Sequence, residues 1–283
     1  MIQSLSIVWD FDPVFFTIPG LGWEIRYYGL TWALAILVAA KFFDNFVKRE
    51  GLPEKVSESV FIYATLGTIL GSRLGHCLFY DPGYYLSQPW EIITGFRDGG
   101  MASHGAAIGI LVGLWLFSRK NRLPYLWSLD RIMIGVAIGG MMVRLGNLCN
   151  SEIFGTATDL PWGFEFVRSA KWSNEFAPAA VHPTQLYEAL CYLVTFVVLT
   201  VMYYRYDLAR RRPGLLFGVG LIGIFLSRIL IETIKTTQES FEEGMTLNMG
   251  QLLSIPFLLL AGYMIYRALR RPAVDVQSKQ SKK

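Results

Sequence analysis

Seven long, predominantly apolar segments constrain the fold of this chain more than any other feature of its sequence. They lie at about residues 28–47, 58–80, 101–118, 129–149, 184–204, 214–234 and 248–268. A helix of about 20 apolar residues is long enough to cross the hydrocarbon core of a bilayer. The composition agrees, because 53% of the 283 residues are hydrophobic and only 17% are charged, against about 25% charged in soluble domains. We therefore expect an all-α integral membrane protein with about seven transmembrane helices.

The segments outside these helices predict the domain organisation. Residues 1–27 lack the basic start of a signal peptide, and their apolar stretch is too short to span a membrane. We expect residues 1–27 to lie at the outer interface, followed by a transmembrane domain over residues 28–268. Residues 150–183 would form an outer loop within that domain, and residues 269–283 would form a basic cytoplasmic tail.

The positions of Lys and Arg predict the orientation in the membrane. Basic runs at 48–55, 119–122, 205–212 and 267–283 would all fall on one side of the seven helices. Because short loops rich in Lys and Arg stay in the cytoplasm, we expect the C-terminus inside and the N-terminus outside. The net charge of +4 is then a topology signal that attracts anionic lipid headgroups, and we expect no nucleic-acid partner. The opposite side carries only scattered basic residues, at Arg26, Arg97, Arg168, Lys171 and Lys235.

The three cysteines, Cys77, Cys149 and Cys191, do not have the spacing of metal ligands. Cys77 and Cys149 are near the outer ends of their predicted helices. The sequence allows either a disulfide between these two or a pair of buried thiols.

The polar residues inside the predicted helices gather in their outer halves, while the inner halves are almost purely apolar. An arginine at membrane depth costs about 2.5–3.5 kcal/mol on insertion scales, so several at one depth imply a polar interior. The guanidinium fork matches a phosphate or carboxylate with two hydrogen bonds. The pattern therefore indicates a site for a phospholipid headgroup in the outer leaflet. Its members are Tyr28, Arg73, His104, Arg144, Asn147, Gln185, Tyr187, Glu188, Arg228, Glu232, Asn248 and Gln251.

Several of these residues also have a structural explanation. Arg228 and Glu232 are spaced i, i+4 and could simply neutralise each other on one helix face. Arg73 could extend outward to the interface, and His104 could bond to the backbone at its helix end. Arg144 is harder to explain in this way, because Asn147 follows it at i+3 beside a polar loop.

The run from Arg144 to Gly155, RLGNLCNSEIFG, closely resembles the signature of the prolipoprotein diacylglyceryl transferase family, R-x-G-N-F-x-N-x-E-x-x-G. Leu148 stands where the family usually has Phe, which affects packing rather than chemistry. The resemblance extends over nearly the whole chain, with His76 where a Tyr is common. The other matching segments are YGL at 28–30, GSRLG at 71–75, FY at 79–80, DGGMASHG at 98–105, HPTQLYE at 182–188, Arg228 with Glu232, and GQLLS at 250–254.

The resemblance implies a reaction and a location. The family transfers the sn-1,2-diacylglyceryl group of phosphatidylglycerol to the thiol of the lipobox cysteine in a prolipoprotein signal peptide. A thioether forms and glycerol phosphate is released, and no metal, nucleotide or covalent cofactor is expected. The partners would be phosphatidylglycerol, prolipoprotein signal peptides and the lipid bilayer. The chain would lie in the bacterial inner membrane with its active site toward the outer leaflet.

The chemistry assigns hypothetical roles to the clustered residues. His104 is the expected base that forms the thiolate, and Arg144 and Arg228 are expected to stabilise the departing phosphate. Glu232 would orient Arg228, and His182 is expected to be structural. The expected headgroup-binding residues are Tyr28, Arg73, Asn147, Asn150 and Glu152 together with Glu232.

Other functional classes fit the sequence less well. A transporter or binding protein for an anionic lipid or solute would also have an arginine-lined site, but transporters usually show inverted repeats and a site near the midplane. An intramembrane metalloprotease would group its histidines as ligands, whereas here they are scattered. In the outer loop, the aromatic residues could anchor the interface or cover the incoming peptide. They are Trp162, Phe164, Phe166, Trp172 and Phe176.

Overall fold

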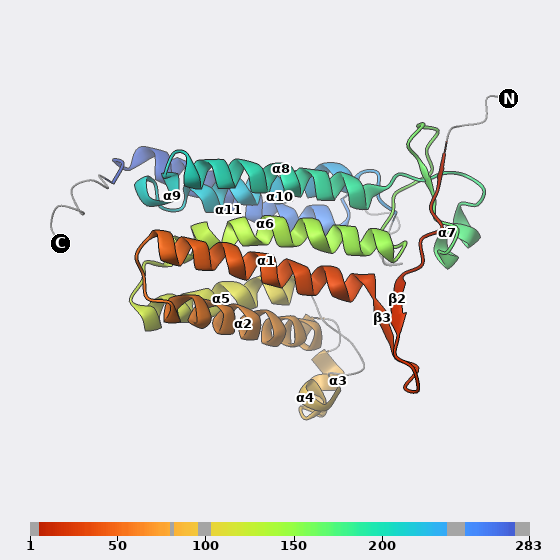
Figure 1. Cartoon of the computed structure of the whole chain (residues 1–283), viewed down its shortest axis with the longest axis horizontal. Helices are drawn as coiled ribbons and strands as arrows, with labels where there is room; N and C mark the ends of the chain where they lie inside the picture. Colours follow the sequence, from red (N-terminus) through yellow and green to blue (C-terminus); the bar gives the residue numbers. More distant parts are fainter. Residues whose placement is uncertain (1–5, 80–81, 96–102, 237–246, 275–283) are drawn as a thin grey trace. The chain divides into compact units, whose positions relative to one another are not determined.

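The computed structural model describes residues 6–79, 82–95, 103–236 and 247–274 (Figure 1). The chain forms two compact units, one made of residues 1–41 with 130–283 and the other of residues 42–129. The predicted basic tail at 269–283 lies mostly outside the described residues, as does most of the segment 98–102 that precedes His104.

Each of the seven predicted apolar segments lies on a long helix. Five of these helices, α1, α6, α8, α10 and α11, are long and apolar enough to cross a membrane. In α2, Arg73 and His76 lower the mean hydropathy, and the polar end at 119–121 shortens the apolar part of α5. A helical protein with several helices able to cross a membrane is therefore confirmed, while the number seven stays a prediction. The helices are α1 (Tyr27–Arg49), α2 (Lys55–Phe79), α5 (Ser103–Asn121), α6 (Tyr125–Cys149), α8 (Thr184–Tyr204), α10 (Leu215–Glu232) and α11 (Met249–Arg270).

In the first unit, α10 packs against both α8 and α11, and the three run side by side (Figure 1). Buried Asp130 of α6 fixes the start of α10 by accepting hydrogen bonds from the backbone N–H groups of Gly214 (2.7 Å) and Phe217 (2.9 Å). These donors have no partner within the helix itself. Asn248 and Gln251 begin α11 with a capping box, in which each side chain accepts a hydrogen bond from the other residue's backbone N–H.

In the second unit, α2 and α5 approach closely through glycines. A Cβ added at Gly109 would overlap the carbonyl oxygen of Gly67, and one at Gly105 would overlap that of Gly71. Such small residues allow two helix backbones to come into contact. The short helices α3 (Pro82–Ser87) and α4 (Glu91–Thr94) follow α2.

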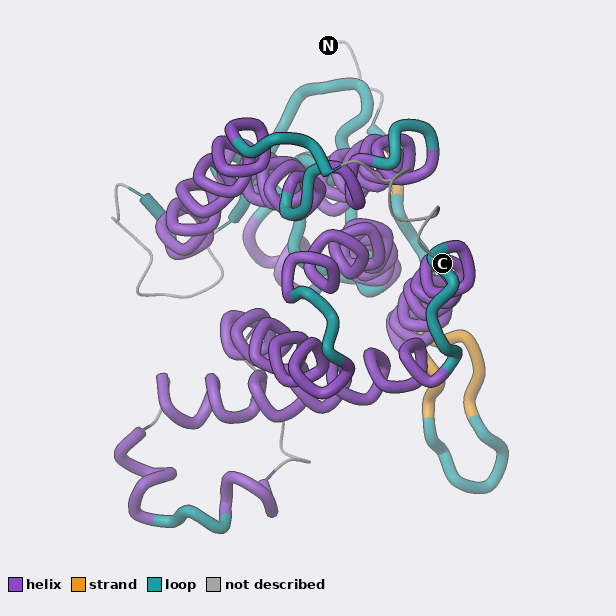
Figure 2. Tube along the Cα trace, turned by 90° about the vertical axis from the view of Figure 1, so that its left-hand side faces the viewer, coloured by secondary structure: helices purple, strands orange, loops and turns teal. Residues whose placement is uncertain are grey.

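The segments that precede and connect the helices of the first unit contain short strands. β1 (Ile7–Val8) pairs in parallel with β4 (Phe164–Glu165), while β2 (Val14–Thr17) and β3 (Glu24–Arg26) form an antiparallel hairpin, visible as the two orange arms in Figure 2. The apolar stretch near residue 14 is therefore a strand, and its location at a membrane interface stays a prediction.

The loop at 150–183 folds around its own small core. Phe164, Phe166 and Trp172 are buried there, close to the short helix α7 (Ala170–Glu175), and Phe176 packs against them. Side chains buried in this way cannot reach lipid, so interface anchoring does not explain them. Trp162 is half exposed, at 50%.

Candidate active site

The end of α6 and the loop after it form one polar arrangement. The Arg144 guanidinium donates to the side-chain oxygen of Asn147 (3.2 Å). The Asn147 amide donates to the carboxylate of Glu152 (2.8 Å), and Asn150 donates to the same oxygen (3.4 Å). Ser151 adopts a positive φ of 54°, which turns the chain back so that Glu152 reaches the helix end. These four predicted site residues are therefore in direct contact.

The start of α8 holds this loop in place. Gln185 donates from its side-chain amide to the backbone carbonyl of Glu152 (2.6 Å), and Thr184 donates from its hydroxyl to the carbonyl of Ile153 (2.8 Å). Both side chains are fully buried. Buried polar groups that are hydrogen-bonded in this way fix a single conformation, so the loop is well positioned relative to Arg144.

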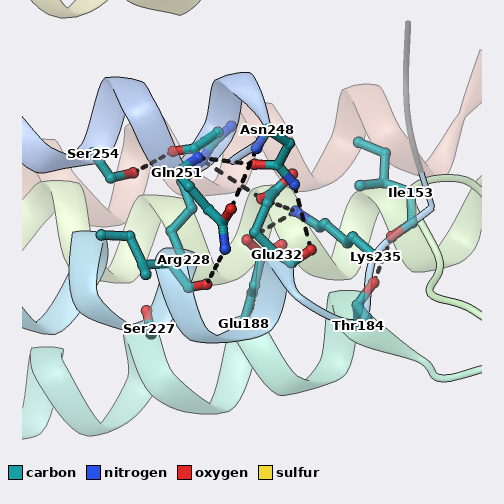
Figure 3. A network of polar contacts seen from close by, with 12 residues as sticks. Ile153, Thr184, Glu188, Ser227, Arg228, Glu232, Lys235, Asn248, Gln251 and Ser254 are labelled. Atoms are coloured by element: carbon teal, nitrogen blue, oxygen red, sulfur yellow. Dashed lines mark hydrogen bonds and ion pairs between the residues drawn. The ribbon is translucent and has the colours of Figure 1, made fainter. Parts of the chain in front are cut away.

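An ion-pair chain links Arg144 to Arg228 through residues of three elements. Glu188 of α8 forms an ion pair with Arg144 (2.8 Å) and accepts a hydrogen bond from Lys235 (3.1 Å). Lys235 also pairs with Glu232 of α10 (3.5 Å), and the Arg228 guanidinium is 4.0 Å from the same carboxylate. Figure 3 shows Glu188, Glu232 and Lys235 pointing toward one another. The two arginines thus belong to one polar network.

The ion pairs of this network are largely buried. Arg144, Lys235 and Arg228 pair with Glu188 and Glu232, and the side chains of Glu188 and Lys235 are 0% and 2% exposed. Burying charges is costly unless they are paired, which explains why each of these two carboxylates contacts two cations. Arg228 has the most accessible side chain of the five, at 29% exposed, so its guanidinium is the one best placed to meet an anionic ligand.

Lys235 was missing from the predicted polar cluster, and Glu188 was in that cluster without a predicted role. Glu188 is recognisable as a polar residue opening a helix, but its pairing with Arg144 joins segments 44 positions apart and leaves no local pattern. Lys235 looks like a loop residue because α10 ends at Glu232. Its spacing of three from Glu232 was the only available signal.

The start of α11 also contacts Glu232. A Cβ at Gly250 would lie 2.6 Å from the carboxyl carbon of Glu232, so only glycine leaves room for this carboxylate. Asn248 donates to the backbone carbonyl of Glu232 (3.4 Å), and Gln251 donates to that of Ile229 (3.3 Å). The positive end of the helix dipole also stabilises a carboxylate at this position.

Tyr28 lies beside the same turn of α6. A Cβ at Gly146 would be 2.9 Å from the Tyr28 ring, so α1 and α6 touch between Arg144 and Asn147. Tyr28 is half-buried and therefore belongs to the edge of the polar arrangement.

Arg73 and His104 belong to the second unit. Buried Arg73 donates to the backbone carbonyls of Ile92 (2.9 Å) and Glu91 (2.7 Å), and it lies over the ring of Tyr85. These contacts fix α4 and explain how a charged residue is tolerated on α2. His104 is in the first turn of α5, and its side chain lies outside the described residues.

His182 lies just before α8, where Trp162 and His182 both approach the hydroxyl of Tyr187, at 3.0 and 3.3 Å. Its backbone pairs with that of residues 155 and 156, as expected for a structural residue. Partial burial lowers the pKa of His182, so its imidazole is neutral at physiological pH.

The described cysteines are free thiols, and within the described part of the chain no three His, Cys, Asp or Glu side chains are grouped as metal ligands. The candidate site therefore offers cationic and amide donors for an anionic group.

Comparisons with known proteins identify the family of this chain. The family model for prolipoprotein diacylglyceryl transferase matches residues 13–267. A phosphatidylglycerol–prolipoprotein diacylglyceryl transferase of Porphyromonas gingivalis is 49% identical, covering 96% of this chain and 98% of that protein. Proteins of the same name from Bacteroides fragilis and Chloroherpeton thalassium are 40% and 38% identical, over 93% and 98% of this chain. The chain therefore belongs to the prolipoprotein diacylglyceryl transferase family.

Proposed function

We propose that this protein transfers the sn-1,2-diacylglyceryl group of phosphatidylglycerol to the thiol of the lipobox cysteine of a prolipoprotein. The single observation that supports this most strongly is the family match over residues 13–267, because it includes the whole polar network. The network adds a physical reason, since two arginines joined through Glu188, Lys235 and Glu232 suit a phosphate-bearing substrate.

In the proposed reaction, the substrate thiolate attacks the carbon of the diacylglyceryl group that is bonded to the phosphate oxygen. A carbon–sulfur bond forms, the carbon–oxygen bond to phosphate breaks, and glycerol phosphate leaves with the electron pair. His104 takes the proton of the thiol, because only the thiolate is a good nucleophile. Arg144 and Arg228 stabilise the negative charge on the leaving phosphate.

The remaining network residues hold these groups in place. Glu188 and Lys235 position Arg144, and Glu232 orients Arg228. Asn147, Asn150 and Glu152 bind the headgroup together with Tyr28 at the edge of the site, and Glu232 contributes from α10. We also keep Arg73 among the headgroup-binding residues, although its guanidinium already donates to two backbone carbonyls.

We further propose a location and a topology. Seven helices cross the bacterial inner membrane within residues 28–268. Five of them are the helices that are long and apolar enough to cross a membrane, and α2 and α5 are the other two. Residues 1–27 and the loop at 150–183 lie outside, and the basic tail at 269–283 lies in the cytoplasm. The basic runs at one end of the helices support this orientation. The active site then faces the outer leaflet.

The first experiment is mass spectrometry of a lipobox peptide incubated with the purified protein and phosphatidylglycerol. A matched peptide with Cys→Ser serves as the control for the nucleophile. We expect a diacylglyceryl mass on the Cys peptide alone, together with free glycerol phosphate. No adduct from a folded, lipid-binding protein would contradict the transferase and favour a carrier or binding protein for an anionic lipid.

Two protein variants connect the activity to the site. Arg144→Gln removes a charge from the network, while Arg119→Gln removes one from an exposed position at the end of α5. We expect the first variant to lose transfer and the second to retain it. Equal activity of both would exclude Arg144 from the mechanism.

A further inference from the structure

Arginines line a cavity at the opposite end of α10 from Arg228. The cavity lies between the turn that precedes α10 and the end of α11, and its volume is about 130 Å³. A water molecule occupies roughly 30 Å³ in the liquid, so a phosphate group fits inside. Its lining includes Arg211, Arg212, Arg267 and Arg271. We call this cavity the arginine pocket.

Backbone contacts build the walls of the arginine pocket. Arg212 donates to the backbone carbonyls of Ala268 (2.9 Å) and Leu269 (3.1 Å), which have no partner within α11. The backbone N–H of Val274 donates to the carbonyl of Arg211 (2.9 Å), and both residues line the cavity. Backbone hydrogen bonds therefore hold together the two segments that carry the arginines.

The described lining of the pocket is positively charged. Among the described residues that line it, none is Asp or Glu. Arg212 already donates hydrogen bonds to the free carbonyls at the C-terminal end of α11. The other arginines are therefore not needed to bind those carbonyls. Among the described residues, no hydrogen bond or ion pair is made by the guanidinium groups of Arg211, Arg267 and Arg271.

The surroundings of the pocket suit a lipid. Tyr266 and Leu269 of α11 lie next to its arginines in the sequence and are 60% and 57% exposed. In a helix apolar enough to cross a membrane, such side chains face acyl chains. A basic pocket beside membrane helices is a favourable site for a phospholipid headgroup.

We propose that the arginine pocket binds the phosphate of an anionic phospholipid in the leaflet nearest the end of α11. A topology signal alone requires only basic residues near a helix end, whereas here four arginines line one cavity. This site is separate from the network around Glu188 and does not depend on the transferase reaction.

The test measures retention of phosphatidylglycerol by the full-length protein in mixed phosphatidylglycerol–phosphatidylcholine micelles, using native mass spectrometry. The double variant Arg267→Gln, Arg271→Gln removes two charges from the pocket. The control variant Arg119→Gln, Lys120→Gln removes two exposed charges from the end of α5. We expect the pocket variant to lose one retained lipid, with roughly thirtyfold weaker binding, and the control to retain it. Unchanged retention, or equal loss in both variants, would overturn the proposal.

Two further arms distinguish folding defects and the source of the phosphate. Val274→Glu keeps every arginine and its own backbone hydrogen bond, yet places a carboxylate at the pocket, so it should also expel the lipid without lowering the melting temperature. Retention by this variant would contradict the proposal. An excess of inorganic phosphate should leave the lipid bound. Displacement of the lipid by inorganic phosphate would instead assign the pocket to a free anion.

Discussion

Lys235 lies between two carboxylates from different helices, Glu188 and Glu232, and its side chain is almost fully buried. Sequence order placed this residue in an outer loop, where it appeared to serve only the charge balance between the two membrane sides. Its contacts give it a more specific role, because it is the only described group that touches both carboxylates. At the residue scale, the site therefore depends on one lysine that sequence reasoning did not identify.

Replacing Lys235 with Met removes the ammonium group and keeps most of the stem. The buried carboxylates of Glu188 and Glu232 then lose the cation that lies between them. Breaking a buried ion pair costs about 3–5 kcal/mol of stability. We expect a lower melting temperature in detergent and loss of diacylglyceryl transfer. Lys235→Arg should restore part of both, while Lys120→Met at an exposed position should change neither. A fully active, stable Lys235→Met protein would show that the network does not need this charge.

His182 predicts how stability depends on pH. Its pKa is lowered in the folded protein, so the unfolded chain binds more protons around the usual histidine value of about 6.5. Its contribution to stability is therefore complete above that value and is lost as the pH falls through it. Thermal melting from pH 8 to pH 5 should show this loss, and the His182→Asn variant should show a smaller one. Parallel curves for the two proteins would contradict the assignment to His182.

The elements differ in how they achieve close packing. The α2–α5 pair relies on Gly67, Gly71, Gly105 and Gly109, whereas α10 and α11 are joined by polar contacts around Glu232. The spacing of four between these glycines within each helix is typical of close helix packing, and the structure shows that close approach. The capping box that begins α11 was visible only as two polar residues and was assigned to the polar cluster.

A test at the element scale adds a side chain between α2 and α5. In Gly109→Val, the new Cβ would overlap the Gly67 carbonyl oxygen, so the helices must separate. Overpacking of this kind costs about 1–3 kcal/mol, and we expect a lower melting temperature and more aggregate in size-exclusion chromatography. Gly262→Val is the matched control, because nothing lies within 4 Å of a Cβ at that position in α11. Equal melting of the two variants would refute the packing role.

At the scale of the whole molecule, the number and direction of the membrane crossings are the main expectations to test. Single cysteines in a background without the three native ones can be labelled from outside intact cells with an impermeant maleimide. Trp162→Cys, in the outer loop, and Ile93→Cys, on α4, should be labelled, while Glu54→Cys, before α2, should not. Opposite labelling of residues 54 and 93 would place α2 across the membrane. Labelling of both from outside would contradict the seven-helix topology.

The long apolar segments predicted the helices well because membrane helices have a strong, local composition signal. The run from Arg144 to Glu152 was also predictable, since its members are close in sequence and contact one another. The partners of Arg144 across α8 and beyond α10 were not predictable, because pairing between distant segments depends on how the helices pack. For the same reason, the burial of the aromatic residues in the loop at 150–183 could not be predicted. Phe164, Phe166 and Trp172 form a core that cannot be distinguished in the sequence from a set of interface anchors.

The carboxylate of Asp130 bonds to two N–H groups at the start of α10, and this contact sets the register of a helix whose other end carries Arg228. The distance between them along the helix is roughly 20 Å at 1.5 Å per residue. A slip of one residue would rotate every side chain of α10 by about 100° and turn Arg228 away from its neighbours. Asp130 therefore fixes the rotation of α10 about its own axis, so the orientation of Arg228 depends on a contact at the opposite end of the helix.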